Sequence, residues 1–285
     1  MDGIWQRRRS EIGLGYLLMA SQESQLRRFR LDLAYDGRPF AGWQSQAGGN
    51  TIQDRLLAEL RAVCPEIATV QGSGRTDAGV GASGQVAHFD VPAGWRMNGG
   101  EWQRALNSKL PPAIRVMRCL GVSNEFHARF TAEGKLYRYD ISTGEVLSPL
   151  LHGLAWHRRG LEDTNALAEV LGLYMGIHDF RAFSANRNDG KDEERDTVRD
   201  ITLAKIDSDV DGTAGRLRLW FRGNGFLYKM VRFLVGTAVY NLEGKISNEE
   251  MTLLLQGSEP DKKAPFCAPP DGLSLEHVYY PENFE

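Results

Sequence analysis

The order in which strand-like and helix-like hydrophobic patterns follow one another constrains the fold of this chain more than any other feature of its sequence. In the first part the order is strand, helix, strand, helix, strand, over 29–35, 51–63, 85–91, 100–109 and 114–120. The second part is similar, with strands near 136–142, 198–207, 215–223 and 273–280, and helices near 163–175, 226–242 and after a Ser247–Glu250 capping box. Two parts of similar mixed order favour an α+β architecture with a pseudo-repeat.

Two segments lie outside these patterns. Residues 1–28 carry Arg7 to Arg9 before a short apolar stretch over 12–20. That stretch is too short to span a bilayer, and we expect a disordered N-terminal extension rather than a signal peptide. The polar segment 186–196 is expected to be a mobile loop between elements.

Charge, cysteines and histidines disfavour several kinds of site. The net charge of −3 gives no overall sign of nucleic-acid binding, although a local basic strip can still bind phosphate. Three widely spaced cysteines argue against a disulfide framework and favour a reducing cytoplasm. The histidines show no zinc-ligand spacing, so no metal is expected. His178 and Asp179 could suggest metal ligands, but adjacent side chains point in different directions, so packing or capping is expected.

The strongest candidate for chemistry is a glycine-rich segment over 72–90, GSGRTDAGVGASGQVAHFD. Its glycines permit tight turns and close approach of the backbone to a ligand, and they frame Arg75 and Asp77. Asp77 is therefore a candidate reactive carboxylate, which Arg75 could pair with and keep ionised. An ordinary turn with a solvated Arg–Asp pair is the alternative.

The same segment contains the spacing of a dinucleotide-binding motif, G-x-G-x-x-G, at Gly79, Gly81 and Gly84. That motif requires a strand before it and a helix after it. Here residues 85–89 continue as a strand pattern, so no nucleotide cofactor is expected.

A basic strand is a candidate RNA contact. Alternation over 215–223 places Arg216, Arg218, Trp220 and Arg222 on one face. Such a face could follow a phosphate backbone and stack a base. A solvated sheet face explains the pattern equally well.

Longer motifs accompany GRTDAGV and GQVAHFD along the chain. They are YDGRPFAGWQ (35–44) with TIQDRLL (51–57), FHARFTAEGKLYRYDI (126–141), GIHDFRAF (176–183), GFLYKMVRFLVG (225–236) and APPDGLSLEHVYY (268–280). With these motifs in order, the chain resembles the tRNA pseudouridine synthase A family from Tyr35 to Tyr280.

The resemblance implies a cytoplasmic isomerase that needs no cofactor and converts uridine to pseudouridine at positions 38, 39 and 40 of the tRNA anticodon stem-loop. It implies an α+β fold of two ferredoxin-like (RRM-like) halves, residues 29–123 and 124–285, whose mostly antiparallel sheets run together around a central active-site cleft. It also implies a homodimer, with tRNA as the partner.

The resemblance also assigns roles to single residues. Asp77 would be the nucleophile, and Arg75 would shape the site and contact RNA. Tyr137 would stack on the target uracil, and Arg232 would form an ion pair with Asp77. The family usually has histidine where this chain has Gly81, which puts RNA positioning near the loop in doubt rather than the nucleophile.

Each role has a plainer alternative. A strand tyrosine such as Tyr137 is usually a packing residue. Arg232 lies in an apolar helix, where an arginine is normally paired because an isolated buried charge is costly. A non-catalytic RNA-binding protein with the same fold is the main rival function. A nucleoside or sugar hydrolase is less favoured, because such enzymes generally use two carboxyl groups.

Overall fold

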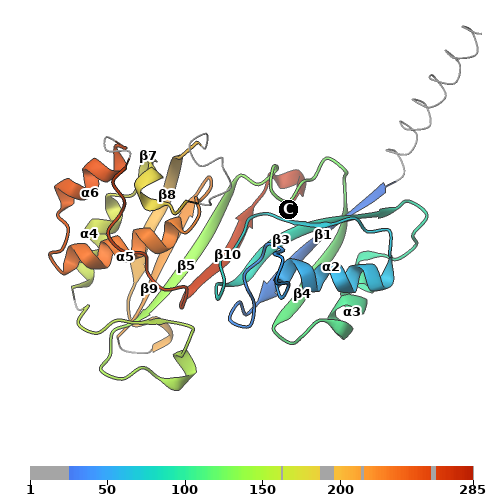
Figure 1. Ribbon diagram of the computed structural model, residues 1–285, viewed down its shortest axis with the longest axis horizontal. Helices are drawn as coiled ribbons and strands as arrows, with labels where there is room; N and C mark the ends of the chain where they lie inside the picture. Colours follow the sequence, from blue (N-terminus) through green and yellow to red (C-terminus); the bar gives the residue numbers. More distant parts are fainter. Residues whose placement is uncertain (1–25, 162, 187–195, 213–214, 258–260, 285) are drawn as a thin grey trace, which may run out of the picture.

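A computed structural model describes residues 26–161, 163–186, 196–212, 215–257 and 261–284. In these residues a ten-stranded, mostly antiparallel sheet is packed against helices, so the predicted α+β class is confirmed (Figure 1). Residues 1–25, predicted to be an extension, and residues 187–195, in the predicted loop, lie outside the described part of the chain.

The first part of the chain forms four strands and two helices. They are β1 (Leu26–Tyr35), α2 (Ile52–Val63), β2 (Val70–Gly72), β3 (Gly81–Pro92), α3 (Gly99–Lys109) and β4 (Ile114–Val122). Both helices begin with capping boxes, Thr51 with Asp54 and Asn98 with Glu101, which satisfy backbone N–H groups that a helix start otherwise leaves unpaired.

The second part adds six strands and three α-helices among the described residues. They are β5 (Gly134–Ser142), β6 (Trp156–His157), α4 (Thr164–Gly172), β7 (Gly176–Asp179), β8 (Val198–Asp207), β9 (Arg216–Gly223), α5 (Met230–Leu242), α6 (Asn248–Leu255) and β10 (Leu273–Tyr279). Short 3-10 helices span Pro149–Leu151, Phe180–Phe183, Val210–Gly212 and Glu282–Phe284. The predicted capping box of Ser247 and Glu250 starts α6.

The strand order of the sheet is β4-β1-β3-β10-β5-β9-β8-β7, with β2 paired to β3 and β6 to β5. Strands of the first part occupy the order β4-β1-β3 with β2 beside β3, and strands of the second part occupy the order β10-β5-β9-β8-β7 with β6 beside β5. The two sets of strands meet where β3 and β10 run parallel, at Gly81 with Ser274 and Ala82 with Leu275. Figure 1 shows β10, the last strand, lying between β3 and β5.

The core follows from strand alternation and from one apolar helix. Phe29, Leu31 and Leu33 of β1 are almost completely buried, as their alternation predicts. Helix α5 buries eight of its residues, including Leu234 and Val235. Burial of each Leu or Phe stabilises the fold by about 1.5–3 kcal/mol. None of the helices in the described residues combines the length and apolar composition that a membrane span needs.

Several predicted boundaries differ from the observed ones, and three of these differences have a clear consequence for the fold. Strand β1 begins at Leu26, not Phe29. Strand β3 begins at Gly81, inside the predicted loop, because pairing with β1 and β10 holds these small residues in the sheet. Helix α5 begins at Met230 rather than 226, because Lys229 has a left-handed backbone, with φ of 61°.

Candidate active site

The segment between β2 and β3 packs closely against the loop that follows β1, where glycines permit the approach of the two backbones. A Cβ atom on Gly37 would lie 2.0 Å from the carbonyl oxygen of Val80. A Cβ atom on Gly42 would lie 2.7 Å from the carbonyl oxygen of Thr76, and Gly42 has φ of +92°. Trp43 N–H donates to that same carbonyl at 3.0 Å. These contacts fix the backbone on both sides of Asp77.

Buried hydrogen bonds also hold the loop that carries Asp77. The hydroxyls of Tyr35 and Thr76 are 2.9 Å apart, and the Gln85 amide donates to the Gly74 carbonyl at 3.0 Å. Ser73 Oγ donates to Gln85 Oε1 at 2.7 Å. Burial raises the pKa of Tyr35 to about 12, so its phenol stays neutral at physiological pH. The loop is therefore preorganised before any substrate binds.

Arg232 lies against Asp77. Its Nη1 is 3.0 Å from Asp77 Oδ2, and the two side chains are only 13% and 16% exposed. Arg232 Nε also donates to the carbonyl of Ala268 at 2.7 Å. The guanidinium is thus anchored on one side and presents a charge-assisted hydrogen bond to the carboxylate on the other.

Tyr137 lies on β5 near the same carboxylate. It is 7% exposed and packs edge-on against Phe226, with 4.9 Å between ring centroids. Burial, followed by the proximity of Tyr35 and Asp77, raises the pKa of its phenol. The ring is held rigidly, as a stacking surface for a planar ligand would be.

Asp77, Tyr137 and Arg75 line one cavity of about 1060 Å³, and Arg232 contacts Asp77. The four residues singled out in the sequence therefore come together. Arg75, however, does not pair with Asp77: its Nε donates to Gln44 Oε1 at 3.0 Å and its side chain is exposed. The ion-pair partner of Asp77 is Arg232.

The charge of this cavity is opposite in sign to that of the whole chain. Its lining includes the cations Arg75, Arg129, Lys135 and Lys229, and Asp77 is the one carboxylate among the described residues that line it. A cavity with this balance attracts a polyanion locally even though the chain carries −3.

Lys135 was not predicted from the sequence to be a site residue. Its Nζ donates to the carbonyl of Ser73 at 2.9 Å, and it lines the cavity two residues before Tyr137. Burial, together with the positive charges of Arg129 and Arg199, lowers the pKa of its ammonium to about 8. Strand alternation was the available signal, since it places residues 135 and 137 on the same face.

The predicted basic face of β9 lies on the other side of the sheet. Phe221 is the partner of Tyr137 across β5 and β9, whereas Trp220 is the partner of Arg138. Residues 216, 218, 220 and 222 therefore point away from the Tyr137 face. Arg216 and Arg218 are 2.8 Å from the buried carboxylate of Asp140, so these two arginines stabilise the sheet.

Gly81 also belongs to that other side. It lines a second cavity of about 500 Å³ together with Arg138, Asp140 and Arg216, and not the cavity of Asp77. A Cβ atom there would lie 3.3 Å from the carbonyl of Tyr35, a tight contact. The glycine that replaces the histidine usual in the resembled family thus leaves the lining of the Asp77 cavity unchanged.

The structure also shows the surroundings of two disfavoured motifs. Gly81 and Gly84 lie within β3 and no helix follows them, so the dinucleotide motif lacks its structural context. Asp179 caps the 3-10 helix at Phe180–Phe183, and His178 Nε2 lies 2.8 Å from the carbonyl of Met175. Within the described residues no group of three or more acidic, histidine or cysteine side chains is arranged to bind a metal.

Sequence comparison agrees with this geometry. The sequence model of a family described as tRNA pseudouridine synthase matches residues 33–131 and 171–281. The tRNA pseudouridine synthase A of Akkermansia muciniphila is 45% identical over 256 residues, which cover 90% of this chain and 96% of the relative. The proteins of the same name from Chromobacterium violaceum and Brevibacillus brevis are 40% and 38% identical, each over 90% of this chain and over 94% and 100% of their own lengths. This chain, with its anchored aspartate–arginine pair in a basic cavity, belongs to the tRNA pseudouridine synthase A family.

Proposed function

We propose that this protein isomerises uridine to pseudouridine in tRNA, at positions 38, 39 and 40 of the anticodon stem-loop, with Asp77 as the reacting carboxylate. The observation that carries the proposal is the Asp77–Arg232 ion pair beside the Tyr137 ring in one basic cavity. The names of the relatives specify tRNA as their substrate. The cavity is large enough for a nucleotide that has left its stack, as enzymes acting on bases commonly require.

In the proposed reaction the Asp77 carboxylate attacks C1′ of the target nucleoside. The N1–C1′ bond breaks, and its electron pair leaves with the uracil. The detached base turns, C5 bonds to C1′, and the bond from C1′ to the carboxylate breaks. Loss of the C5 proton, with a proton gained at N1, completes the isomerisation, and no oxidant or water is consumed. A route through a glycal, in which Asp77 first removes the C2′ proton, places the carboxylate at the same site.

The neighbours of Asp77 have matching tasks. Arg232 orients the carboxylate through its 3.0 Å contact. Tyr137 offers a plane on which the uracil can stack while it is detached. Arg75, exposed at the cavity, contacts RNA, and the other lining cations offset the phosphate charge. No cofactor is required, because the reaction is a rearrangement within one nucleotide.

The proposed division into two halves and the proposed cellular location rest on the resemblance to the family. We infer that residues 29–123 and 124–285 are the two halves of the enzyme, with Asp77 supplied by one half and Tyr137 and Arg232 by the other. The three cysteines are free thiols, in keeping with the proposed cytoplasmic location.

A homodimer is proposed as the working assembly. Met117 and Leu154 are exposed apolar side chains beside the second cavity, and Val146 and Leu150 are more than four-fifths exposed. Exposed apolar side chains of this kind suit contact with a second copy of the chain. Sedimentation velocity at micromolar concentration is expected to give twice the chain mass, and a monomer at all concentrations would contradict the proposal.

The function is tested with unmodified tRNA transcripts and site-specific pseudouridine mapping. Wild-type protein is expected to give pseudouridine at positions 38–40, and Asp77→Asn, which removes the charge with little change in shape, is expected to give none. Asp261→Asn is the matched control, because Asp261 is exposed and does not line the cavity. Its product yield should equal that of the wild type.

Other outcomes identify the rival functions. Equal product from wild type and Asp77→Asn would refute the assigned nucleophile. Tight tRNA binding without product on any transcript would favour the RNA-binding alternative. Release of free uracil in place of pseudouridine would indicate a hydrolase.

A further inference from the structure

Phe130 exposes an aromatic ring at the edge of the Asp77 cavity. Its side chain is 75% exposed, and it lines the cavity together with His127 and Arg129. Leaving a phenyl ring in water forgoes most of the stabilisation that its burial would give. Among the described residues, Phe130 is the one aromatic residue in the set of exposed large hydrophobic residues, and it lines the cavity.

The ring stands on a rigid turn. Thr131 N–H donates to the carbonyl of His127 at 3.0 Å, and Thr131 Oγ1 donates to the same carbonyl at 2.7 Å. The N–H groups of Arg129 and Phe130 both donate to His127 Nδ1, at 3.1 and 3.2 Å. The imidazole also stacks on Phe130, with 4.2 Å between centroids and 28° between planes. His127 therefore fixes both the backbone of the turn and one face of the Phe130 ring.

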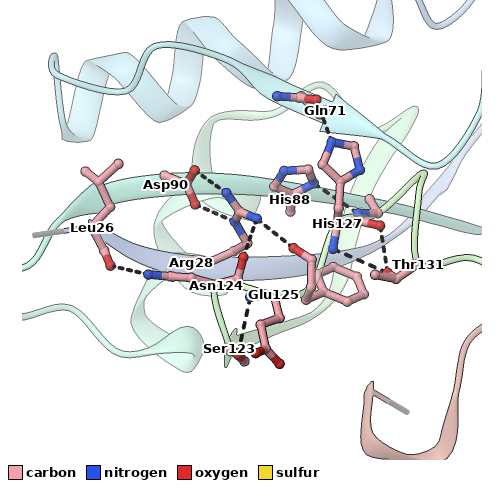
Figure 2. A network of polar contacts seen from close by, with 12 residues as sticks. Leu26, Arg28, Gln71, His88, Asp90, Ser123, Asn124, Glu125, His127 and Thr131 are labelled. Atoms are coloured by element: carbon pink, nitrogen blue, oxygen red, sulfur yellow. Dashed lines mark hydrogen bonds and ion pairs between the residues drawn. The ribbon is translucent and has the colours of Figure 1, made fainter. Parts of the chain in front are cut away.

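His127 is itself held in one tautomer. Because Nδ1 accepts two backbone N–H groups, the proton resides on Nε2, which lies 3.0 Å from Gln71 Oε1 and donates to it (Figure 2). Burial, followed by the charges of Arg28 and Arg129, lowers the pKa of this imidazole. The ring therefore stays neutral at neutral pH, which keeps Nδ1 available as the acceptor that the turn needs.

A polar network anchors the segment that leads into the turn. Arg28 forms two bonds to Asp90, at 2.7 and 2.8 Å, and donates to the carbonyl of Phe126 at 2.8 Å (Figure 2). His88 Nδ1 accepts the N–H of Ala128 at 3.2 Å. The exposed ring is thus preorganised by β1 and β3, and no flexible loop tip carries it.

Arg129 adds a charge beside this ring. It is exposed, its guanidinium carbon is 5.7 Å from the Phe130 centroid, and no carboxylate of the described residues forms an ion pair with it. A rigid aromatic plane next to a free guanidinium is the combination that binds an unpaired base and its phosphate. A second copy of the chain would use the ring but would leave this cation without an evident partner.

We propose that Phe130 is a stacking site for the nucleobase adjacent to the target uridine, with Arg129 on the neighbouring phosphate. This inference rests on the proposed function. When the target nucleotide leaves its stack, the adjacent base loses a stacking partner, and the Phe130 ring replaces it. Stacking of one base on an aromatic side chain is worth about 1–3 kcal/mol.

The proposal is tested by tRNA binding in an Asp77→Asn background, so that binding is measured whether or not catalysis occurs. Phe130→Ala is expected to weaken tRNA affinity by about 5- to 150-fold, which is 1–3 kcal/mol. Phe130→Trp should keep the affinity within about threefold, because stacking needs only a ring. Ile177→Ala is the matched control, since Ile177 is 72% exposed but does not line the cavity.

An abasic nucleotide identifies the base. Two RNAs are compared, one abasic at the nucleotide 5′ of the target and one abasic at the nucleotide 3′ of it. The loss of affinity caused by Phe130→Ala should disappear with one of these two RNAs. A penalty that persists with both abasic RNAs, or equal affinity of Phe130→Ala and Phe130, would overturn the proposal. Loss of dimers in Phe130→Ala during sedimentation would also overturn it in favour of a subunit contact. Failure of the wild type to make pseudouridine would refute the proposed function but would leave these binding results to be judged separately.

Discussion

Lys135 shows how a single residue at the site can favour function over stability. Its ammonium lines the Asp77 cavity and reaches the carbonyl of Ser73 at 2.9 Å. The described residues offer it no carboxylate within ion-pair distance. Its lowered pKa, about 8, means that the folded state disfavours the charged form. Perturbed groups of this kind are common at functional sites.

Lys135→Met should therefore raise stability while it lowers activity. The folded pKa is about 8 and the unfolded value is near 10.5, so the charge costs stability at every pH below 8. At pH 7 the variant should be more stable by about 1 kcal/mol after loss of the Ser73 hydrogen bond. Urea unfolding at several pH values measures this, and the advantage should shrink as the pH rises from 8 to 10.5. A variant less stable than wild type at pH 7 would show that the ammonium is stabilising, and unchanged pseudouridine yield would remove Lys135 from the site.

At the scale of elements, β5 and β9 divide their residues between two tasks. One face carries Tyr137 toward the cavity, and the other carries the arginine cluster around Asp140, which is 1% exposed. Arg216 and Arg218 each lie 2.8 Å from this carboxylate. A buried charge with its partners in place is tolerated, whereas removal of one partner leaves the others uncompensated.

Asp140→Ala is expected to destabilise the protein by about 3 kcal/mol, because two arginines would remain partly buried without their carboxylate. Lys205→Ala on β8 is the comparison, since its ion pair with Asp207 is exposed and should be worth less than about 1 kcal/mol. Thermal and urea unfolding measure both variants. If Asp140→Ala kept wild-type stability and lost tRNA affinity, the basic face would have to be assigned to RNA binding.

For the whole molecule, the decisive feature is the junction between the two sets of strands. Asp77 follows strand β2 on one side, and Tyr137 and Arg232 belong to elements on the other. They meet only because β3 and β10 pair, a contact in which Ser83 Oγ also donates to Glu276 Oε2 at 2.8 Å. A Cβ atom on Gly84 would lie 2.1 Å from the carbonyl oxygen of Glu276, so the strands can approach this closely only with glycine there.

Gly84→Ala should accordingly force β3 and β10 apart. We expect a loss of about 1–3 kcal/mol in the free energy of unfolding, as for overpacking in a core, and a fall in pseudouridine yield in the fraction that remains folded. Gly94→Ala is the control, because a Cβ atom at Gly94 meets nothing within 4 Å. Normal activity and stability of Gly84→Ala would show that the junction can relax without disturbing the site.

Part of this site was predictable from the sequence because the signals are local. The glycines around Asp77 mark a tight loop, and an arginine in the apolar pattern of α5 demands a partner. Lys135 and Phe130 were not predicted, because a strand lysine and a single phenylalanine have ordinary roles in most contexts. The sequence predicted which side chains of β9 share one face. It did not predict that this face lies on the side of the sheet opposite Tyr137.

By itself the sequence determined the α+β class, the residue types available for chemistry and all the longer elements, because periodicity, caps and glycine turns act over a few residues; the short strands β2, β6 and β7 were not predicted. The local sequence pointed to Arg75 as the partner of Asp77 and the family resemblance to Arg232; only the tertiary structure decided between them, for Arg232, 155 positions away, and against Arg75, two positions away. It also decided which cations share the cavity and which are neutralised by Asp140. The physical reason is that charge pairing depends on distance through space, and strand order sets that distance independently of separation along the chain.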